Sequence, residues 1–356
     1  MRNAAMLLAI WPLSAAADPV KLLRLSEMKK RMEASTTASY VIQDLSELKG
    51  VKMQDALGIL YPQLVAPVAN AQVEVVNGKR KVVAAPCGPA EKKIEEAEGL
   101  FQRKEFGTAR KLYDEAIALA PACYVAHAYR GDADLFAGDA ASALGHYDRA
   151  LVINPDDASV HFFRSTALRQ LGRTEEMKTE LRWAMALRPR NPTVLQIVNR
   201  SVGRLGLRVE DVGVNLWGFA RKEGDSVGIY FDEKQPAWLG YALCKGFWLG
   251  DPDHRREMTG STEVLFTLEG ERECLVALLT AYETEREKRT DETLERLYRI
   301  VESGAGDAWI VYELGSRVDP QIMLKVTPKL QREVLEFVTK YVMVDEAAPA
   351  SSVRTR

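Results

Sequence analysis

The chain of 356 residues has no excess of either charge. Its 48 basic residues are balanced by 50 acidic residues, which leaves a formal net charge of −2. A protein that binds the nucleic-acid backbone usually presents a basic face, so we expect no nucleic-acid partner. No apolar run reaches the roughly 18 to 20 residues that a membrane-spanning helix needs, so no transmembrane segment is predicted.

Histidine is scarce, and the common catalytic motifs are missing. The chain has four histidines. It contains no phosphate-binding glycine loop, no G-x-S-x-G or H-E-x-x-H motif and no calcium-binding loop, so we predict neither a cofactor nor a metal. The composition, 47% hydrophobic and 28% charged, is that of a folded protein long enough for two or three domains.

The four cysteines form no C-x-x-C pair. Cys244 and Cys274 stand among apolar residues, which is typical of small core side chains. A disulfide between them could form in an exported protein, but the sequence alone does not establish one. Metal binding by these thiols is less favoured, because no histidine or cysteine partners cluster beside them.

The first residues resemble a short secretory signal peptide. Arg2 precedes an apolar stretch at 4–13, and the small residues Ala15 and Ala17 suit a signal peptidase. Cleavage there would remove residues 1–17 and export the protein to the periplasm or the medium. The alternative is an ordinary apolar N-terminal helix in a cytoplasmic protein.

Prolines at intervals of 34 residues reveal an internal repeat: Pro121, Pro155 and Pro189. An alanine stands five residues before each proline, and a large side chain stands eight residues before it. The alanines are Ala116, Ala150 and Ala184, and the large side chains are Tyr113, Tyr147 and Leu181. A period of this length indicates stacked helix pairs, because one pair alone cannot bury its apolar faces.

Small residues fit the same arrangement. Gly138 and Gly172 suit the left-handed turn that ends the first helix of a pair. Small side chains also recur at one position of the first helix, where we expect two helix backbones to approach closely. These residues are Ala97, Gly131 and Ser165.

The pattern resembles the tetratricopeptide repeat family, whose unit has alanine, an aromatic residue and proline at these offsets. The resemblance covers three copies at about 90–189. Tyr124 to Asp157 is the best-matching copy, whereas the third copy departs at Met177 and Leu181. The resemblance implies a mainly α fold, a solenoid of three helix pairs that is closed by a capping helix from Thr193 to about Gly203.

In this family, the first helix of each pair lines a concave surface that binds other polypeptides. The corresponding side chains here are mostly apolar or aromatic, with few charges, and we expect six of them to bind the partner: Val125, Tyr129, Phe136, Phe162, Phe163 and Arg169. Members that grip a C-terminal carboxylate use lysine, arginine and asparagine on this surface. Ile94, Glu98 and Tyr129 stand there instead, so that activity is not implied.

Two interpretations of the aromatic surface stay open. It is a groove for an extended or helical peptide, with the aromatic side chains as anchors. Alternatively, it packs against the flanking regions of the chain itself, because so apolar a surface is costly to expose.

The repeats with their capping helix are expected to form one domain at 90–204, between flanking regions at 18–89 and at 207–344. The first is predicted to contain helices and a β-hairpin around Asn77 and Gly78, and the second to be mostly helical. The predicted elements are helices at Lys21–Ala34, Val51–Leu60, Pro236–Leu249, Glu263–Lys288, Asp291–Glu302 and from Pro328 to about Val342, with a strand at Ser226–Phe231. The tail, 345–356, is predicted to be flexible.

One histidine outside the repeats lies in a polar stretch, Asp251–Glu257. Carboxylates beside His254 could hold a metal or share a proton. A turn and helix start at Asp-Pro-Asp is favoured, because no second set of ligands is placed to complete a site. His127 and His161 occupy the same position in two repeats, and we expect both to pack in the array.

The sequence therefore predicts an interaction or scaffold protein that binds a protein or peptide partner without catalysis. The alternative is an enzyme with its site in 207–344, near the Asp251–Glu257 stretch, and with the repeats as a recognition arm. A third possibility is a structural member of an envelope or secretion assembly.

Overall fold

The computed structural model describes residues 22–48, 56–62, 66–288 and 290–346. The predicted signal peptide, 1–17, and most of the predicted flexible tail lie outside these residues.

The chain forms two compact units, each assembled from two separated segments. The sheet unit contains residues up to 65 together with Val212–Asp319, and the array unit contains Ala66–Asp211 together with the residues from Pro320 onward. This division differs from the consecutive domains expected at 18–89, 90–204 and 207–344. The reason is that each unit pairs elements that are far apart in the sequence.

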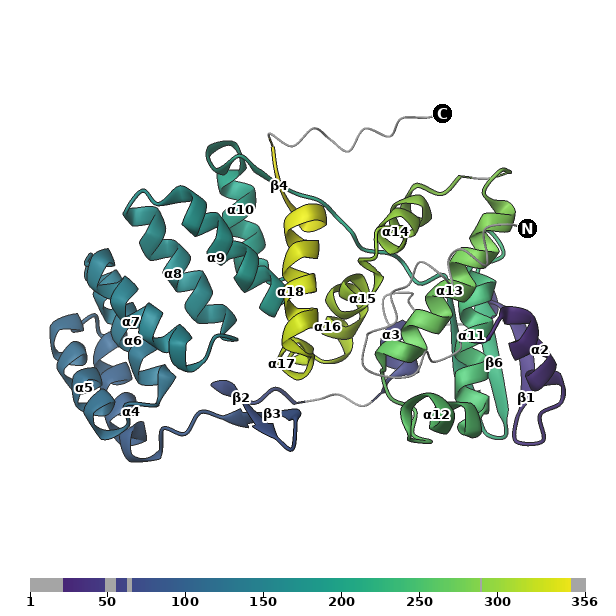
Figure 1. The fold of residues 1–356 in the computed structure, drawn as a ribbon, viewed down its shortest axis with the longest axis horizontal. Helices are drawn as coiled ribbons and strands as arrows, with labels where there is room; N and C mark the ends of the chain where they lie inside the picture. Colours follow the sequence, from purple (N-terminus) through teal and green to yellow (C-terminus); the bar gives the residue numbers. More distant parts are fainter. Residues whose placement is uncertain (1–21, 49–55, 63–65, 289, 347–356) are drawn as a thin grey trace. The chain divides into compact units, whose positions relative to one another are not determined.

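The array unit is built on three antiparallel helix pairs, which follow one another along the chain (Figure 1). The pairs are α4 (Glu91–Gln102) with α5 (Phe106–Leu119), α6 (Tyr124–Phe136) with α7 (Ala140–Ile153), and α8 (Ala158–Gln170) with α9 (Thr174–Leu187). Each pair packs on the next, as the solenoid prediction requires. The predicted mainly α fold is confirmed.

The turns inside the helix pairs have the predicted backbone conformation. Gly138 and Gly172 have φ angles of 91° and 73°, in the left-handed region that glycine adopts without steric cost. The corresponding residue of the first pair is Lys104, and its φ is 64°. The first turn therefore places a side chain where the other two have none.

A small residue is needed at Gly131 for a different reason from the one expected. A Cβ added to Gly131 would lie 2.8 Å from Cε1 of Tyr147, a fully buried ring of α7. The position is small because an aromatic ring covers it, and not because two helix backbones meet there.

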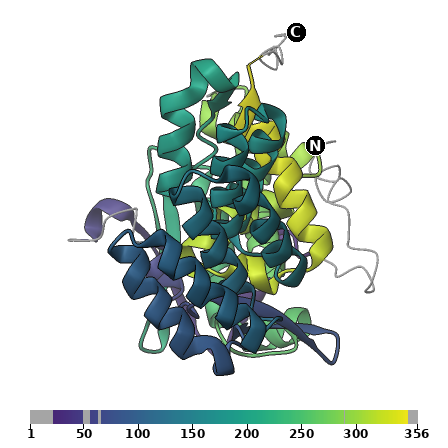
Figure 2. The ribbon, with the colours of Figure 1, turned by 90° about the vertical axis from the view of Figure 1, so that its left-hand side faces the viewer.

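Helices from both segments close the end of the array. The predicted capping helix is α10 (Pro192–Leu205), which packs on α9. On α9 also lies α18 (Pro328–Phe337), seen in yellow beside the teal helices in Figure 2. The short helix α17 (Ile322–Lys325) and the antiparallel strands β4 (Leu207–Val209) and β7 (Met343–Asp345) complete this end. Asp345, predicted to begin the flexible tail, thus belongs to a strand.

The predicted hairpin is present as β2 (Ala71–Val76) and β3 (Lys79–Ala84). It is anchored to the array at the loop before α8. The carbonyl oxygen of Ala71 accepts a hydrogen bond of 3.0 Å from Nδ2 of Asn154, and Arg80 forms an ion pair with Asp156. Just after the hairpin, a disulfide joins Cys87 to Cys123.

The sheet unit contains a three-stranded sheet in the order β1 (Ser39–Asp44), β6 (Ser226–Phe231), β5 (Gly218–Glu223). The strand predicted at 226–231 is confirmed as β6. Strand β1 pairs with β6 in parallel register, and β5 pairs with it in antiparallel register. This pairing brings the N-terminal segment into the same unit as the residues after 212.

Helices pack on this sheet in successive layers. The largely buried α11 (Trp238–Gly250) lies on β5 and β6, and α13 (Leu268–Glu285) lies on α11. The remaining α-helices described in this unit are α2 (Leu25–Glu33), α3 (Ala56–Leu60), α12 (Pro252–Thr259), α14 (Glu292–Glu302), α15 (Gly306–Trp309) and α16 (Ser316–Val318), and a π-helix at Ile310–Gly315 connects the last two. Helix α13 begins later than predicted, because Thr267 caps it by accepting from the Gly270 N–H. A second disulfide links α11 to α13 through Cys244 and Cys274.

Within the described residues, no helix is both long enough and apolar enough to cross a membrane.

Candidate functional site

The inner helices α6 and α8 border a hollow of about 260 Å³. Its lining from these two helices consists mainly of Tyr124, Val125, Ala128, Tyr129, Asp132 and Phe163. Tyr147 of α7, Asp157 at the start of α8 and Asn70 before the hairpin also line it. The hollow is slightly smaller than ordinary small-molecule pockets, which occupy about 300–1,000 Å³.

Three of the six predicted binding residues line this hollow, namely Val125, Tyr129 and Phe163. Val125 is only 3% exposed, so it contributes mainly packing. Phe136 and Phe162 do not line the hollow, and neither does Arg169, which is exposed near the end of α8.

Five phenylalanine rings form a continuous row that reaches the hollow at Phe163. The successive centroid distances are 5.4 Å for Phe106–Phe101, 5.4 Å for Phe101–Phe136, 6.4 Å for Phe136–Phe163 and 5.3 Å for Phe163–Phe162. Phe136 is 56% exposed, although it lies in the middle of the row. This phenylalanine row therefore offers an aromatic surface beside the hollow.

The hairpin covers one edge of the hollow and leaves part of the aromatic surface exposed. Tyr124 is 2% exposed, and its hydroxyl lies 3.3 Å from the carbonyl oxygen of Ala71. Phe136 remains exposed. Packing within the chain thus explains the burial of Tyr124, whereas the phenylalanine row keeps an exposed surface in the array unit.

Carboxylates around the hollow accept hydrogen bonds from tyrosines. The hydroxyl of Tyr147 donates to Oδ1 of Asp132 at 2.6 Å, and that of Tyr124 donates to Oδ2 of Asp157 at 2.9 Å. The other oxygen of Asp157 caps α8 by accepting from two backbone N–H groups. Both carboxylates are thereby held in fixed positions.

The preceding repeat contains the same kind of pair. Tyr113 donates to the carboxylate of Glu98, and both residues stand 34 positions before Tyr147 and Asp132. In the third copy, Leu181 and Thr166 occupy the corresponding positions. The pair is therefore a feature of the first two repeats.

Burial raises the pKa of Asp132 from its ordinary 3.8 to about 7. The hydrogen bond from Tyr147 opposes this shift, and the negative charges of Glu98 and Asp157 add to it. Asp132 therefore titrates near neutral pH.

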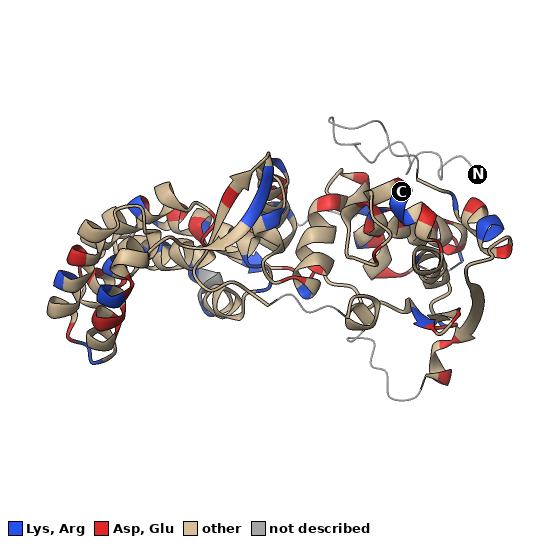
Figure 3. Ribbon diagram, turned by 90° about the horizontal axis from the view of Figure 1, so that it is seen from below, with Lys and Arg blue, Asp and Glu red and all other residues tan. Residues whose placement is uncertain are grey.

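The negative charge of these carboxylates is poorly balanced by neighbouring positive charge. Figure 3 shows acidic and basic residues interspersed along the helices. Yet among the described ion pairs, none joins a lysine or arginine to Glu98, Asp132 or Asp157. Among the residues that the structure describes, no group of three acidic, histidine or cysteine side chains is arranged to hold a metal ion.

The fold of this region is decided by the 34-residue period together with the three helix pairs that follow it. Residues 90–189 fold as a tetratricopeptide-type repeat array. Its glycine turns and its capping helix α10 agree with this assignment.

Solved structures of other tetratricopeptide-repeat domains are similar to part of the chain. The first such domain of Spaghetti (RPAP3), bound to an HSP90 peptide, is 19% identical, with 34% of this chain and 96% of that chain covered and a TM-score of 0.33. The domain of Arabidopsis OM64 is 25% identical, with 32% and 94% covered and a TM-score of 0.31. The Yersinia enterocolitica type III secretion chaperone SycD, in complex with a peptide of the translocator YopD, is 19% identical, with 32% and 88% covered and a TM-score of 0.30. No family model and no curated protein matches the sequence.

The Asp251–Glu257 stretch in the sheet unit is a helix start, as predicted. Asp251 caps α12 by accepting from the backbone N–H of His254. Asp253 points to solvent and pairs with Arg256. His254 itself is buried, and its Nε2 lies 2.8 Å from an oxygen of Glu273, on α13.

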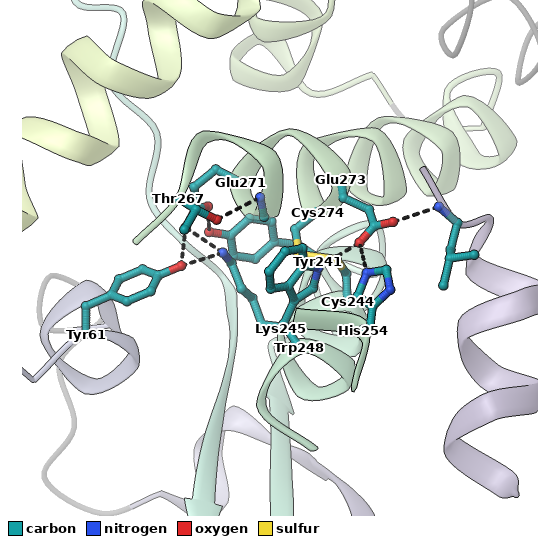
Figure 4. The surroundings of a disulfide bond; sticks show 12 residues. Tyr61, Tyr241, Cys244, Lys245, Trp248, His254, Thr267, Glu271, Glu273 and Cys274 are labelled. Atoms are coloured by element: carbon teal, nitrogen blue, oxygen red, sulfur yellow. Dashed lines mark hydrogen bonds and ion pairs between the residues drawn. A yellow bond between two sulfur atoms is a disulfide. The ribbon is translucent and has the colours of Figure 1, made fainter. Parts of the chain in front are cut away.

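Glu273 is one of two buried glutamates that hold the sheet unit together (Figure 4). Besides contacting His254, it accepts from Nε1 of Trp248 at 2.7 Å and from the backbone N–H of Leu23 at 2.7 Å. Its oxygens are therefore engaged by groups from three separate segments.

The second buried glutamate, Glu271, pairs with Lys245 at 2.5 Å. It also accepts from Tyr241 at 2.8 Å and from Tyr61. Burial lowers the pKa of Lys245, an effect that the charge of Glu271 opposes. The cavity beside Lys245 has a volume of about 20 Å³, room for about one water molecule. These ionisable groups contact one another, and their arrangement joins Tyr61, which follows α3, to α11 and α13.

The two repeat histidines have the packing role that was expected. Nε2 of His127 lies 3.3 Å from the carbonyl oxygen of Pro121, and Nε2 of His161 lies 3.1 Å from that of Pro155. Each histidine thus fastens the start of one pair to the proline that ends the previous one.

Sequence reasoning missed two features of the site. The sequence placed Glu98 on the concave face but gave no sign that Tyr147 and Asp157 lie beside it, so the convergence of three carboxylates was overlooked. The 34-residue interval shared by both Tyr–carboxylate pairs was the available clue. The Cys87–Cys123 disulfide was also missed, because nothing in a spacing of 36 residues indicates a pair.

Proposed function

We propose that the tetratricopeptide-repeat array binds an extended segment of a partner protein along α6 and α8. The observation that carries this proposal is the hollow of about 260 Å³ next to the phenylalanine row. A preformed hollow takes one side chain of the partner, and exposed aromatic rings anchor the neighbouring ones.

The exposure of Phe136 supports a partner in particular. A phenylalanine that is 56% exposed, in the middle of a row of rings, gains little from its own fold. Burying a fully exposed phenylalanine contributes about 1.5–3 kcal/mol, so covering the exposed part of Phe136 contributes on the order of 1–1.5 kcal/mol. A partner that lies along the row gains this energy without rearranging the helices.

Selection from a random 12-residue peptide library tests the proposal. The full chain without residues 1–17 is immobilised, and selected peptides are measured against it by calorimetry. We expect peptides whose affinity falls at least tenfold for the double variant Phe136→Ala, Phe163→Ala, because truncating hot-spot aromatics costs more than 1 kcal/mol each.

The matched control is Val152→Ala on the outer helix α7, where the side chain is 72% exposed. This variant should retain full affinity. If no peptide is selected, or if the selected peptides bind the Phe136, Phe163 double variant unchanged, the proposed function is wrong.

We also propose that the protein is exported. Two disulfides within the described residues support this location, because such bonds persist in oxidising compartments. The apolar N-terminal stretch with alanines at 15 and 17 supports it as well.

Mass spectrometry of the protein from its native cells tests export. We expect a chain that begins at Asp18 and in which all four cysteines resist alkylation until they are reduced. A chain that retains residues 1–17 and carries four free thiols would contradict export.

A further inference from the structure

The hollow in the array combines two features that select the same kind of occupant. One is aromatic, since Tyr129 and Phe163 line the cavity. The other is anionic, since Asp132 and Asp157 line it and Glu98 lies close enough to act on the pKa of Asp132. Aromatic faces and carboxylates both attract cations, by cation–π and by Coulomb interaction.

The charge of this hollow is unbalanced in the free protein. The polar partners of the three carboxylates are tyrosine hydroxyls and the backbone N–H groups at the start of α8. Elsewhere in the array, buried acids are paired with arginine: Asp134 with Arg110 and Arg130, and Glu180 with Arg164. The positive charge that the array supplies at those acids is missing at the hollow.

We propose that the hollow receives a lysine or arginine side chain from the bound segment of the partner protein. This inference rests on the proposed function and specifies its partner. The cation lies between the carboxylates of Asp132 and Asp157, and its aliphatic stem packs on Tyr129 and Phe163. The neighbouring residues of the segment lie along the phenylalanine row.

The size of the hollow accommodates one long side chain. A hollow of about 260 Å³ is below the range of most small-molecule pockets. The described residues offer no metal-binding arrangement there either. A basic side chain carried by an extended peptide matches the size, the charge and the aromatic lining together.

Titration of Asp132 links this recognition to pH. The groups that face it are Tyr147 from α7, Glu98 from α4 and Asp157 at the start of α8. At pH 6 Asp132 is mostly protonated, and at pH 8 it is mostly ionised. A bound cation favours the ionised form, so affinity for a basic side chain rises between these two pH values.

The test uses the peptides selected on the wild-type chain. Each lysine is replaced by norleucine and each arginine by citrulline, which keep the length and remove the charge. We expect selected peptides to share one basic position, whose replacement lowers affinity about tenfold or more. The protein variants are Asp132→Asn and Asp157→Asn, which keep hydrogen-bond acceptors for Tyr147 and for the cap of α8.

The effect of removing the charge from the peptide should also depend on the carboxylates of the protein. The Asn variants should weaken the basic peptide and should no longer distinguish it from its uncharged analogue. The wild-type preference for the basic peptide should increase from pH 6 to pH 8, and the Asp132→Asn variant should lose this dependence. Exposed Asp148→Asn on α7 is the control, and it should behave as wild type.

The possible failures are distinguishable. Peptides that depend on Phe136 and Phe163 but share no basic position, or that bind equally well without the charge, overturn the cation inference and leave the proposed function standing. Absence of any peptide that depends on the phenylalanine row overturns both.

Discussion

The hydroxyl of Tyr147 lies 2.6 Å from Oδ1 of Asp132 and donates a hydrogen bond across the second helix pair. This contact joins the core of the repeat to its concave face, because Tyr147 is fully buried and Asp132 lines the hollow.

Stability of the array should fall as the pH rises through the titration of Asp132. Its pKa is about 7 in the folded protein, against an ordinary value of 3.8, so the folded state holds a proton that the unfolded chain releases in this window. The associated stability is complete below pH 3.8 and is lost by about pH 7. The variant Asp132→Asn removes this loss and keeps an acceptor for Tyr147.

Urea unfolding at pH 4, 6 and 8 measures the effect. The unfolding free energy of Asp132→Asn, relative to that of the wild type, should rise by on the order of 1–3 kcal/mol from pH 4 to pH 8. Asp148→Asn, with an exposed carboxylate, should show no such trend. A stability difference that does not change with pH would contradict the assigned titration.

Lys104 occupies a left-handed position that glycine fills in the next two repeats. At a φ of 64° the backbone of Lys104 is strained, because its Cβ lies too close to the following carbonyl oxygen. The variant Lys104→Gly should therefore raise the unfolding free energy by about 0.5–1 kcal/mol. The reciprocal change, Gly138→Ala at φ 91°, should lower it by about 1 kcal/mol. Thermal unfolding of the two variants should therefore shift in opposite directions, and a common direction would contradict this interpretation.

Each disulfide should stabilise only the unit that contains it. Closing a loop of 36 residues with Cys87–Cys123, or of 30 residues with Cys244–Cys274, contributes about 3–4 kcal/mol. The double variant Cys87→Ala, Cys123→Ala should lose amide protection in α4–α7, and Cys244→Ala, Cys274→Ala should lose it in α11 and α13. Hydrogen exchange measures both, and each variant is the control for the other. Equal loss in both units would show that the bonds do not act locally.

Breaking the Lys245–Glu271 pair should be costly, because it leaves a buried carboxylate without its cation. Lys245 is 3% exposed and Glu271 is fully buried. We expect Lys245→Met to lower the unfolding free energy by about 3–5 kcal/mol and Lys245→Met combined with Glu271→Gln to recover part of that loss. Removing the exposed partner of Asp253 by Arg256→Ala should cost less than about 1 kcal/mol. No recovery in the double variant would show that packing, and not charge, determines the effect.

Alanine substitutions should separate core rings from surface rings in the array. Tyr113 is fully buried, and Tyr113→Ala should cost about 3–5 kcal/mol. Phe136 is 56% exposed, and Phe136→Ala should cost less than about 1 kcal/mol. Urea unfolding of both variants decides whether the phenylalanine row is a surface. A large loss of stability for Phe136→Ala would assign this residue to the core.

Much of the array was predictable, because its period lies in the sequence itself. The prolines at 121, 155 and 189 located the three helix pairs, and Gly138 and Gly172 located two turns. The hairpin at Asn77 and Gly78 was equally local. Several sheet-unit elements were also foreseen, among them β6 and α11.

Pairings between distant segments were not predictable in the same way. Strand β1 pairs with β6 across nearly 190 residues, in a register that aligns Ser39 with Ser226. Helix α18 packs on α9, and Tyr61 reaches Glu271. None of these contacts leaves a period or a motif in the sequence. The expected order of consecutive domains failed for this reason.

The sequence by itself determined the repeated helix pairs, because each repeat makes most of its contacts within itself and with its neighbours. The tertiary structure alone decided which side chains meet in the hollow and which acids lack a cation. Those properties depend on how far apart side chains lie in space, and burial changes their charge only after the helices have packed.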